Sequence, residues 1–193
     1  MLNHVFFDTD FYHVIQWFFF YGFLGWIVES AYMSICNRKW TNRGFVKGPF
    51  IPIYGIGAIL AFFALHRLIY NPILLFAAGS VMATTLEYLT AHLMMVVFGE
   101  FWWDYTEKPY NYKGIICLES SIAWGVYTVG FFYYLHPYVT NMLSGYPYEL
   151  GVFLIKGIFM IVWCDFLCTL YEQKKESLPS SLEEVKEAIF NFF

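Results

Sequence analysis

Five long apolar runs constrain this chain more than any other feature of its sequence. A bilayer core about 30 Å thick is crossed by about 20 mostly apolar residues in a helix. Runs of that kind cover residues 12–36, 50–68, 72–98, 115–135 and 149–171, and connections with glycine and proline separate them. The sequence therefore predicts an all-α fold, a polytopic transmembrane helix bundle of about five spans.

Composition excludes the other broad classes of protein. Hydrophobic residues make up 59% of the 193 and charged residues 13%, whereas a soluble domain carries about 25% charged residues. Disorder needs low hydrophobicity and high net charge, and this chain has neither. A net charge of −4 also argues against nucleic acid, which selects a basic surface. We therefore expect membrane lipids as partners and no nucleic acid.

Basic residues in the connections predict the orientation of the bundle. Lysine and arginine in short loops are retained on the cytoplasmic side of a membrane. Nine of the eleven basic residues lie on one side of the predicted bundle, namely Arg38, Lys39, Arg43, Lys47, Lys108, Lys113, Lys174, Lys175 and Lys186. The N-terminus is therefore predicted outside and the C-terminus inside the cytoplasm.

The end of the chain is predicted to form a tail of residues 172–193, separate from a transmembrane domain of residues 1–171. Ser181 and Glu184 have the spacing of a capping box, which marks the start of a helix. Apolar residues recur on one face behind it, at Leu182, Val185, Ile189 and Phe192. This short amphipathic helix either lies on the inner membrane surface or binds a partner.

Four acidic residues lie within the predicted spans, where a charge is costly unless it is paired or hydrated. Glu29, Glu119 and Asp165 lie about one to two turns from the predicted cytoplasmic ends, and Glu87 lies deeper. Apart from residues near the ends of the spans (His13, His66, Arg67 and Glu149), only one histidine and one distant lysine share the spans with them. Such acids either bind a proton, a cation or a cationic substrate, or they only fasten helices together. The sequence leaves both interpretations open.

Neighbouring residues predict that two of these acids point into the protein. Glu29 shares its helix face with Gly22 and Gly25, which allow another backbone to approach closely. Glu87 lies in a stripe of small or polar residues formed by Ser80, Ala83, Thr84, Thr90 and Ala91. A stripe of this kind faces protein or water rather than lipid.

Two connections carry further potential chemistry. Residues 48–57 contain two prolines and three glycines, so they form either an irregular segment that offers backbone groups to a ligand or a proline-initiated helix. Residues 99–114 contain six aromatic residues, and Trp102, Trp103, Asp104, Tyr105 and Asn111 belong to this segment. These side chains form either an aromatic belt at the headgroup level or a lid over the acids.

Several motifs together carry a resemblance to a known family. They are Tyr21-Gly22-Phe23-Leu24-Gly25-Trp26 with Glu29, Asn42-Arg43-Gly44-Phe45, Gly48-Pro49-Phe50, Pro52-Ile53-Tyr54-Gly55, Glu87-Tyr88-Leu89-Thr90, Phe101-Trp102-Trp103-Asp104-Tyr105, and Asn111 with Gly114-Ile115-Ile116-Cys117-Leu118-Glu119-Ser120. Over roughly its first two thirds the chain thus resembles the bacterial membrane family labelled ABC-transporter permease, type IV or CmpB-like. Many relatives have an arginine where this chain has Ile115, so a basic partner for the acids is expected to be missing.

The resemblance implies a multi-pass protein of the bacterial cytoplasmic (inner, plasma) membrane that belongs to a transporter, without implying a substrate. The chain contains no GxxxxGK[ST] phosphate-binding loop, so ATP hydrolysis would need a separate ATPase subunit. Five spans are few for a complete pathway, which favours a homo-oligomer. We expect no cofactor and no metal.

Three functions remain as hypotheses. The first is a permease-like transport component, in which Glu29, Glu87 and Glu119 line a polar site that opens to the cytoplasm under residues 102–112. The second is an intramembrane enzyme acting on a lipid or isoprenoid headgroup, which no catalytic motif supports. The third is a structural or assembly subunit. The candidate site residues are Glu29, Glu87, Glu119, Asp165, Trp102, Trp103, Asp104, Tyr105 and Asn111.

Overall fold

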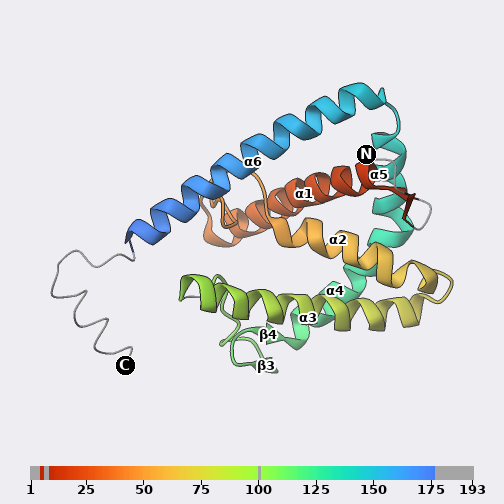
Figure 1. The fold of residues 1–193 in the computed structure, drawn as a ribbon. Helices are drawn as coiled ribbons and strands as arrows, with labels where there is room; N and C mark the ends of the chain where they lie inside the picture. Colours follow the sequence, from red (N-terminus) through yellow and green to blue (C-terminus); the bar gives the residue numbers. More distant parts are fainter. Residues whose placement is uncertain (1–4, 7–8, 100, 177–193) are drawn as a thin grey trace, which may run out of the picture.

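The protein is almost entirely helical in the part that the computed structural model describes, residues 5–6, 9–99 and 101–176 (Figure 1). The α-helices are α1 Phe11–Asn37, α2 Pro52–Leu65, α3 Pro72–Phe98, α4 Leu118–Gly130, α5 His136–Leu143 and α6 Tyr148–Glu176. A 3-10 turn, η1 His66–Leu68, extends α2, and a π-helical turn, η2 Phe131–Leu135, joins α4 to α5. The predicted all-α class is confirmed.

Two antiparallel pairs of two-residue strands complete the regular structure of the described residues. Strand β1, Val5–Phe6, pairs with β2, Thr9–Asp10, ahead of α1. Strand β3, Asn111–Tyr112, pairs with β4, Ile116–Cys117, ahead of α4. The fourth apolar run therefore becomes helical at Leu118, and its predicted start at residue 115 was wrong, because residues 116–117 are held in a strand pair.

Among the described residues, three helices are long and apolar enough to cross a membrane: α1, α3 and residues Tyr148–Glu172 of α6. The second predicted span is a shorter apolar helix, Pro52–Leu68, and α4 has 13 residues before its π-helical continuation. The short helix α5 was predicted as a connection around Pro137. It forms because proline fits the first turn of a helix, where its missing N–H has no helical partner.

Local capping signals explain where the long helices begin and end. The Asp10 side chain accepts from the His13 amide (3.0 Å) at the start of α1, and Asn71 accepts from the Leu74 amide (3.1 Å) at the start of α3. Arg38 and Gly99 follow the same two helices in the left-handed conformation that commonly ends a helix. The boundaries of these helices are therefore encoded in a few adjacent residues.

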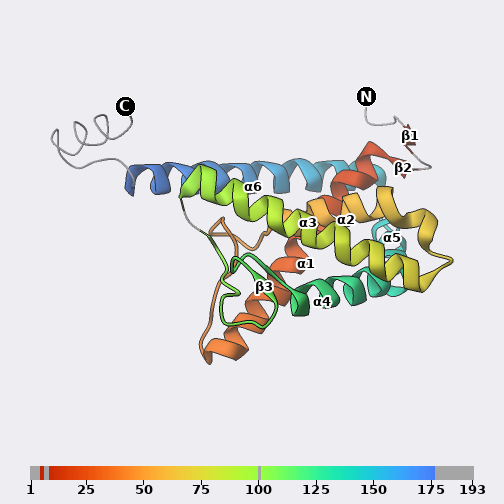
Figure 2. The same ribbon diagram turned by 90° about the horizontal axis from the view of Figure 1, so that it is seen from below.

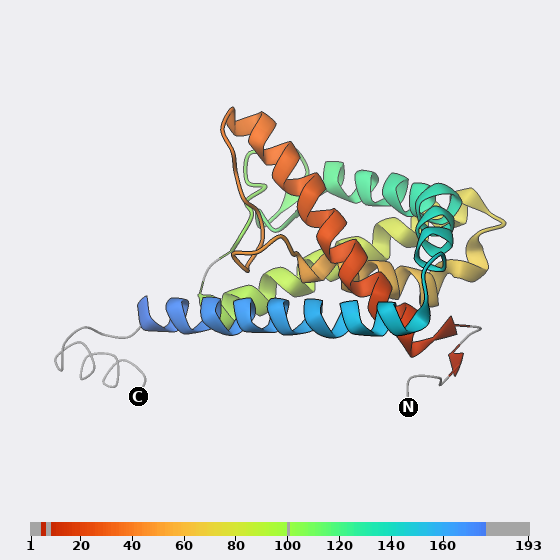
Figure 3. The ribbon, with the colours of Figure 1, turned by 90° about the horizontal axis from the view of Figure 1, so that it is seen from above.

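The helices pack in pairs, α1 against α2 and α3 against α4, and α5 crosses one end of the bundle (Figures 1 and 3). One core cluster joins α1 to α5 and consists of Trp17, Tyr21, Val139 and Leu143. A second joins α2, α3 and η2 and consists of Ala61, Leu65, Leu75 and Phe132. At the opposite end from α5, two long loops lie together, residues 38–51 and residues 101–117 (Figure 2).

Gly22 and Gly25 of α1 were predicted to allow another backbone to approach, and they make room for two aromatic side chains, Phe50 ahead of α2 and Tyr54 on α2. A Cβ atom on Gly22 would lie 2.2 Å from the Phe50 ring, and one on Gly25 would lie 2.2 Å from the Tyr54 ring. The small and polar stripe of α3 likewise faces α4, where the Thr84 hydroxyl donates to Ser121 (2.9 Å). Both faces on which the sequence places an acid are therefore protein contacts.

Helix α6 is the least covered of the three long apolar helices in the described residues. Only 6% of its apolar 18-residue window is buried, against 11% of the window in α3 and 39% of the window in α1. It lies along one side of the bundle, where α1 crosses it at an angle (Figure 3). The helix continues to Glu176, and the predicted tail helix of residues 178–193 lies outside the described residues.

Candidate functional site

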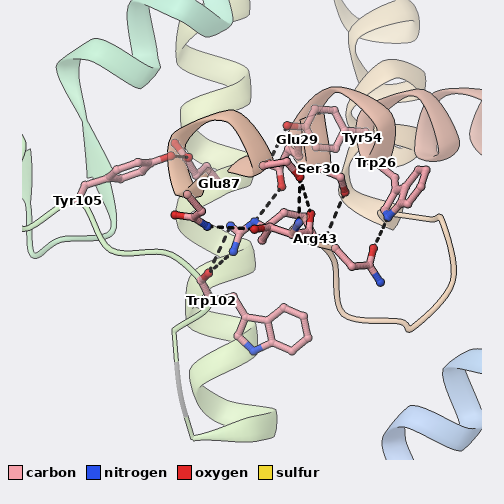
Figure 4. A network of polar contacts seen from close by, with 12 residues as sticks. Trp26, Glu29, Ser30, Arg43, Tyr54, Glu87, Trp102 and Tyr105 are labelled. Atoms are coloured by element: carbon pink, nitrogen blue, oxygen red, sulfur yellow. Dashed lines mark hydrogen bonds and ion pairs between the residues drawn. The ribbon is translucent and has the colours of Figure 1, made fainter. Parts of the chain in front are cut away.

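Side chains from α1, α2, α3 and the two long loops meet in one polar network at the loop end of the bundle (Figure 4). We call Glu29, Arg43, Tyr54, Glu87 and Tyr105 the polar cluster. Two of its members are predicted inward-facing acids, and two others, Arg43 and Tyr105, come from the 38–51 loop and the 101–117 loop. The cluster therefore joins the helices to both loops.

Glu87 is the most enclosed member of the polar cluster, with 6% of its surface exposed. Its Oε1 accepts from the Tyr105 hydroxyl (2.8 Å). Its Oε2 accepts from Trp124 Nε1 (3.3 Å) and from the Ser120 hydroxyl (3.4 Å), both on α4. All three donors are neutral, so this carboxylate is satisfied by uncharged hydrogen-bond partners. Glu87 thereby links α3 to α4 and to the 101–117 loop.

Glu29 is half-buried and has one donor from a helix and one from a loop. Its Oε1 accepts from the Tyr54 hydroxyl (2.9 Å), and its Oε2 lies 3.6 Å from Arg43 Nε. The Tyr54 ring in turn lies against the Trp124 ring, with 6.0 Å between centroids. Because Trp124 also donates to Glu87, these two rings connect the surroundings of the two glutamates.

Arg43 ties three segments of the chain together. Its backbone amide donates to the Ser30 hydroxyl on α1 (3.1 Å), and its guanidinium faces Glu29. Nη1 and Nη2 also donate to the carbonyl oxygen of Trp102 at 3.4 and 3.5 Å. The expectation of a missing basic partner was therefore wrong: Arg43 supplies the cation. In the sequence Arg43 marks the predicted cytoplasmic side and belongs to a family motif, and neither property shows that it faces Glu29.

The Tyr105 hydroxyl remains a donor at physiological pH. Burial and then the neighbouring Glu87 carboxylate hold the pKa of Tyr105 well above its usual range. A protonated hydroxyl donates to the carboxylate, whereas a phenolate would repel it. At physiological pH the Tyr105 hydroxyl is therefore a donor to Glu87, which joins the 101–117 loop to α3.

The other predicted residues of the 101–117 loop hold its shape. The Asn111 amide donates to the carbonyls of Thr106 (3.1 Å) and Lys108 (2.8 Å), and its oxygen accepts from the Gly114 amide (3.0 Å). Asp104 accepts from the hydroxyl of Thr106 and from its amide, and these bonds lower the pKa of Asp104. These hydrogen bonds within the loop therefore hold Tyr105 in the position from which it donates to Glu87.

The two tryptophans attach this loop to its surroundings. Trp103 Nε1 donates to the Ile115 carbonyl (2.8 Å), inside the loop. The Trp102 ring packs against Phe45 of the other loop and Phe98 of α3, with centroids 5.0 and 6.1 Å apart. Trp102 thus contacts the 38–51 loop through its ring as well as through its carbonyl.

The remaining two acids lie outside the polar cluster. Glu119 is exposed and pairs with Lys108 (Nζ to Oε2, 2.9 Å). Asp165 is half-buried on α6, and its Oδ2 accepts from the backbone amide of Gly48 (2.7 Å). The structure thus brings Glu29 and Glu87 into one network and gives the other two acids separate partners. Within the described residues, no group of three or more His, Cys, Asp or Glu side chains can hold a metal ion.

Sequence reasoning missed Tyr54, Ser120 and Trp124 as well as Arg43. Tyr54 belongs to the segment around Pro52 that the sequence singled out for its backbone, and the helix there does begin at that proline. Ser120 and Trp124 follow Glu119 on α4 and face Glu87 through their position on the helix. Ser120 belongs to a family motif, which does not show what it contacts, and Trp124 belongs to none of the motifs.

A helical membrane protein with a polar cluster under two loops is thus the class that the fold and site define. The chain belongs to the family described as Putative ABC-transporter type IV, which matches residues 16–170. The resemblance seen in the sequence motifs is thereby confirmed. No curated protein and no solved structure matches the chain.

Proposed function

We propose that this chain is the membrane-embedded component of a transporter, with the polar cluster as a site that opens toward the two loops. The observation that carries the proposal is the way both loops close on the glutamates. Arg43 of one loop meets Glu29, and Tyr105 of the other meets Glu87. Carboxylates inside a membrane bundle are costly, which makes them candidates for a proton, ion or substrate site.

The direction of opening follows from which segments cover the site. Arg43 and Tyr105 both reach the cluster from the loop end, and the basic residues of the loops predict that this end is cytoplasmic. A ligand would therefore reach Glu87 once Tyr105 releases it. Family membership supports transport as the process, and the protein would act in the bacterial cytoplasmic membrane.

The partners of such a component are part of the proposal. The 193 residues contain no GxxxxGK[ST] loop, so a separate subunit would hydrolyse ATP. Large apolar side chains such as Phe153 (74% exposed) and Ile161 (71%) are open on α6. In a membrane they would contact lipid or a second copy of the chain.

A structural or assembly subunit is the second candidate, and one observation favours it. Each acid has its own partner: neutral donors surround Glu87, Arg43 and Tyr54 meet Glu29, and Glu119 and Asp165 are satisfied elsewhere. On this interpretation the carboxylates fasten helices and loops together. The intramembrane enzyme stays a prediction without an observation in its favour.

Cysteine labelling separates the two candidates without a known substrate. In a variant whose native cysteines are serine, Ala91→Cys places a thiol one turn from Glu87 at a position that is 1% exposed. Adding Tyr105→Phe removes the hydrogen bond to Glu87. We expect labelling by a membrane-impermeant maleimide to become about fivefold faster, since a hydrogen bond contributes about 1 kcal/mol. The measurement is the rate of adduct formation by mass spectrometry in proteoliposomes.

Leu75→Cys is the matched control, because Leu75 lies on the same helix and is 0% exposed. Its labelling should remain slow with or without Tyr105→Phe. If Ala91→Cys stays unlabelled in both backgrounds, the polar cluster only holds the helices and loops together and is not a ligand site. A parallel rise at Leu75→Cys would indicate general unfolding and would count against a site that opens locally.

A further inference from the structure

The C-terminal half of α6 is attached to the 38–51 loop, whereas its first half lies against α1, where Phe159 meets Phe19. Asp165 Oδ2 accepts from the Gly48 amide, and the Phe166 ring packs against Phe45 with centroids 5.3 Å apart. An exposed ion pair between Glu172 and Lys47 (2.5 Å) adds a third contact. Through these three contacts the position of this half of the helix and that of the loop depend on each other.

Asp165 and Gly48 fit closely against each other, so that a larger residue at position 48 would not leave room for the carboxylate. A Cβ atom on Gly48 would lie 2.9 Å from Asp165 Oδ2, so glycine leaves room for the carboxylate. The hydrogen bond from the Gly48 amide to the Asp165 carboxylate is short (2.7 Å) and charge-assisted, which makes it one of the stronger types of hydrogen bond. An acid in the middle of an apolar helix is costly, and this bond offsets part of that cost.

The same loop delivers Arg43 to the polar cluster. Between Gly48 and Arg43 the chain is anchored by Val46, which is 2% exposed, and after Gly48 by Phe50, which is 4% exposed. Both pack in the core cluster that includes Phe166 of α6 among its neighbours. Because this segment is tightly packed, a shift of α6 at Asp165 is expected to move the 38–51 loop and Arg43 with it.

We propose that Asp165 is a positioning residue for the polar cluster: by holding Gly48 it sets the 38–51 loop so that Arg43 reaches Glu29 and the Trp102 carbonyl. Displacement of α6 then releases Arg43 and loosens the 101–117 loop. The position of α6 thereby regulates whether the site is closed. That last step rests on the proposed function, whereas the coupling of α6 to the two loops stands without it.

Hydrogen–deuterium exchange of the full chain in lipid nanodiscs tests the coupling. Asp165→Ala should speed amide exchange at least about tenfold in peptides covering residues 43–51, because a hydrogen bond to a charged group is lost. It should also speed exchange in residues 101–106, which Asp165 does not contact. Asp165→Asn keeps an oxygen acceptor and should restore exchange close to the wild-type rate in both peptides.

Two further variants sharpen the test. Ile161→Ala changes α6 one turn away at a side chain that is 71% exposed, and it should leave both peptides unchanged. Gly48→Ala crowds Asp165 from the other side and should reproduce the Asp165→Ala pattern. Because both changes break the same contact, the double variant should exchange no faster than Asp165→Ala alone.

Acceleration confined to residues 43–51 would overturn the proposal, since Asp165 would then be only a local fastener. Equal effects from Ile161→Ala would overturn it as well. The proposed site is judged separately, by labelling at Ala91→Cys. If Asp165→Ala speeds exchange in both loops but Ala91→Cys stays unlabelled, the coupling stands and the ligand site fails.

Discussion

Glu87→Ala is expected to lower the free energy of unfolding by about 3–5 kcal/mol, because it leaves buried hydrogen-bond donors without an acceptor. The Tyr105 hydroxyl and Trp124 Nε1 lose their acceptor where Glu87 is 6% exposed. The Ser120 hydroxyl is less affected, because it also donates to the Cys117 carbonyl (2.9 Å). Each stranded buried donor costs about 1–3 kcal/mol, and the cavity left by the side chain adds to that.

Two companion variants show whether burial is the cause. Glu87→Gln keeps an oxygen for Tyr105 but places an amide N–H₂ near the donors of α4, so we expect a smaller loss of about 1–2 kcal/mol. Glu119→Ala removes an exposed acid paired with Lys108 and should cost less than about 1 kcal/mol. Urea unfolding in detergent micelles, followed by tryptophan fluorescence, measures all three. Equal losses for Glu87→Ala and Glu119→Ala would contradict the role of the cluster.

Gly25→Ala is expected to lower the free energy of unfolding by about 3 kcal/mol or more. The added Cβ would lie 2.2 Å from Cγ and 2.6 Å from Cβ of Tyr54. These atoms are at the base of the side chain, so rotation about its outer bonds does not clear them. Helices α1 and α2 would have to separate, and the hydrogen bond from Tyr54 to Glu29 would be lost with them.

Gly157→Ala is the matched control for this substitution. Gly157 also lies inside a long apolar helix, but a Cβ there would meet nothing within 4 Å. Alanine has the higher helix propensity, by about 1 kcal/mol, so this variant should be as stable as the wild type or more so. The readout is the monodisperse yield in size-exclusion chromatography together with the unfolding midpoint. Comparable behaviour of the two variants would show that the close approach of α1 and α2 contributes little.

The extents of the long helices could be predicted because their signals are local. The run at residues 72–98 coincides with α3, whose start is marked by Asn71 and Pro72 and whose end by Gly99. The run at residues 115–135 was less well predicted, since a strand pair at residues 116–117 delays α4 and a π-helical turn leads into α5. Hydrophobicity alone does not distinguish a buried strand from the first turn of a helix.

The inward direction of Glu29 and Glu87 could also be predicted, from the glycines and small residues on their own helix faces. Their partners could not. Tyr105 meets Glu87 across 18 positions of sequence, and Asp165 meets Gly48 across 117. No periodicity links such residues, because loop conformation decides which side chains arrive at a given helix face.

Apolar length and helix caps are properties of neighbouring residues, and they were sufficient for the class and the main helices, while the sequence motifs were sufficient for the family. The division of the four acids into one shared cluster and two separate contacts arose only when the chain folded. A carboxylate is satisfied by whatever donors lie within about 3 Å of it, and that depends on how the two loops pass over α1, α3 and α6.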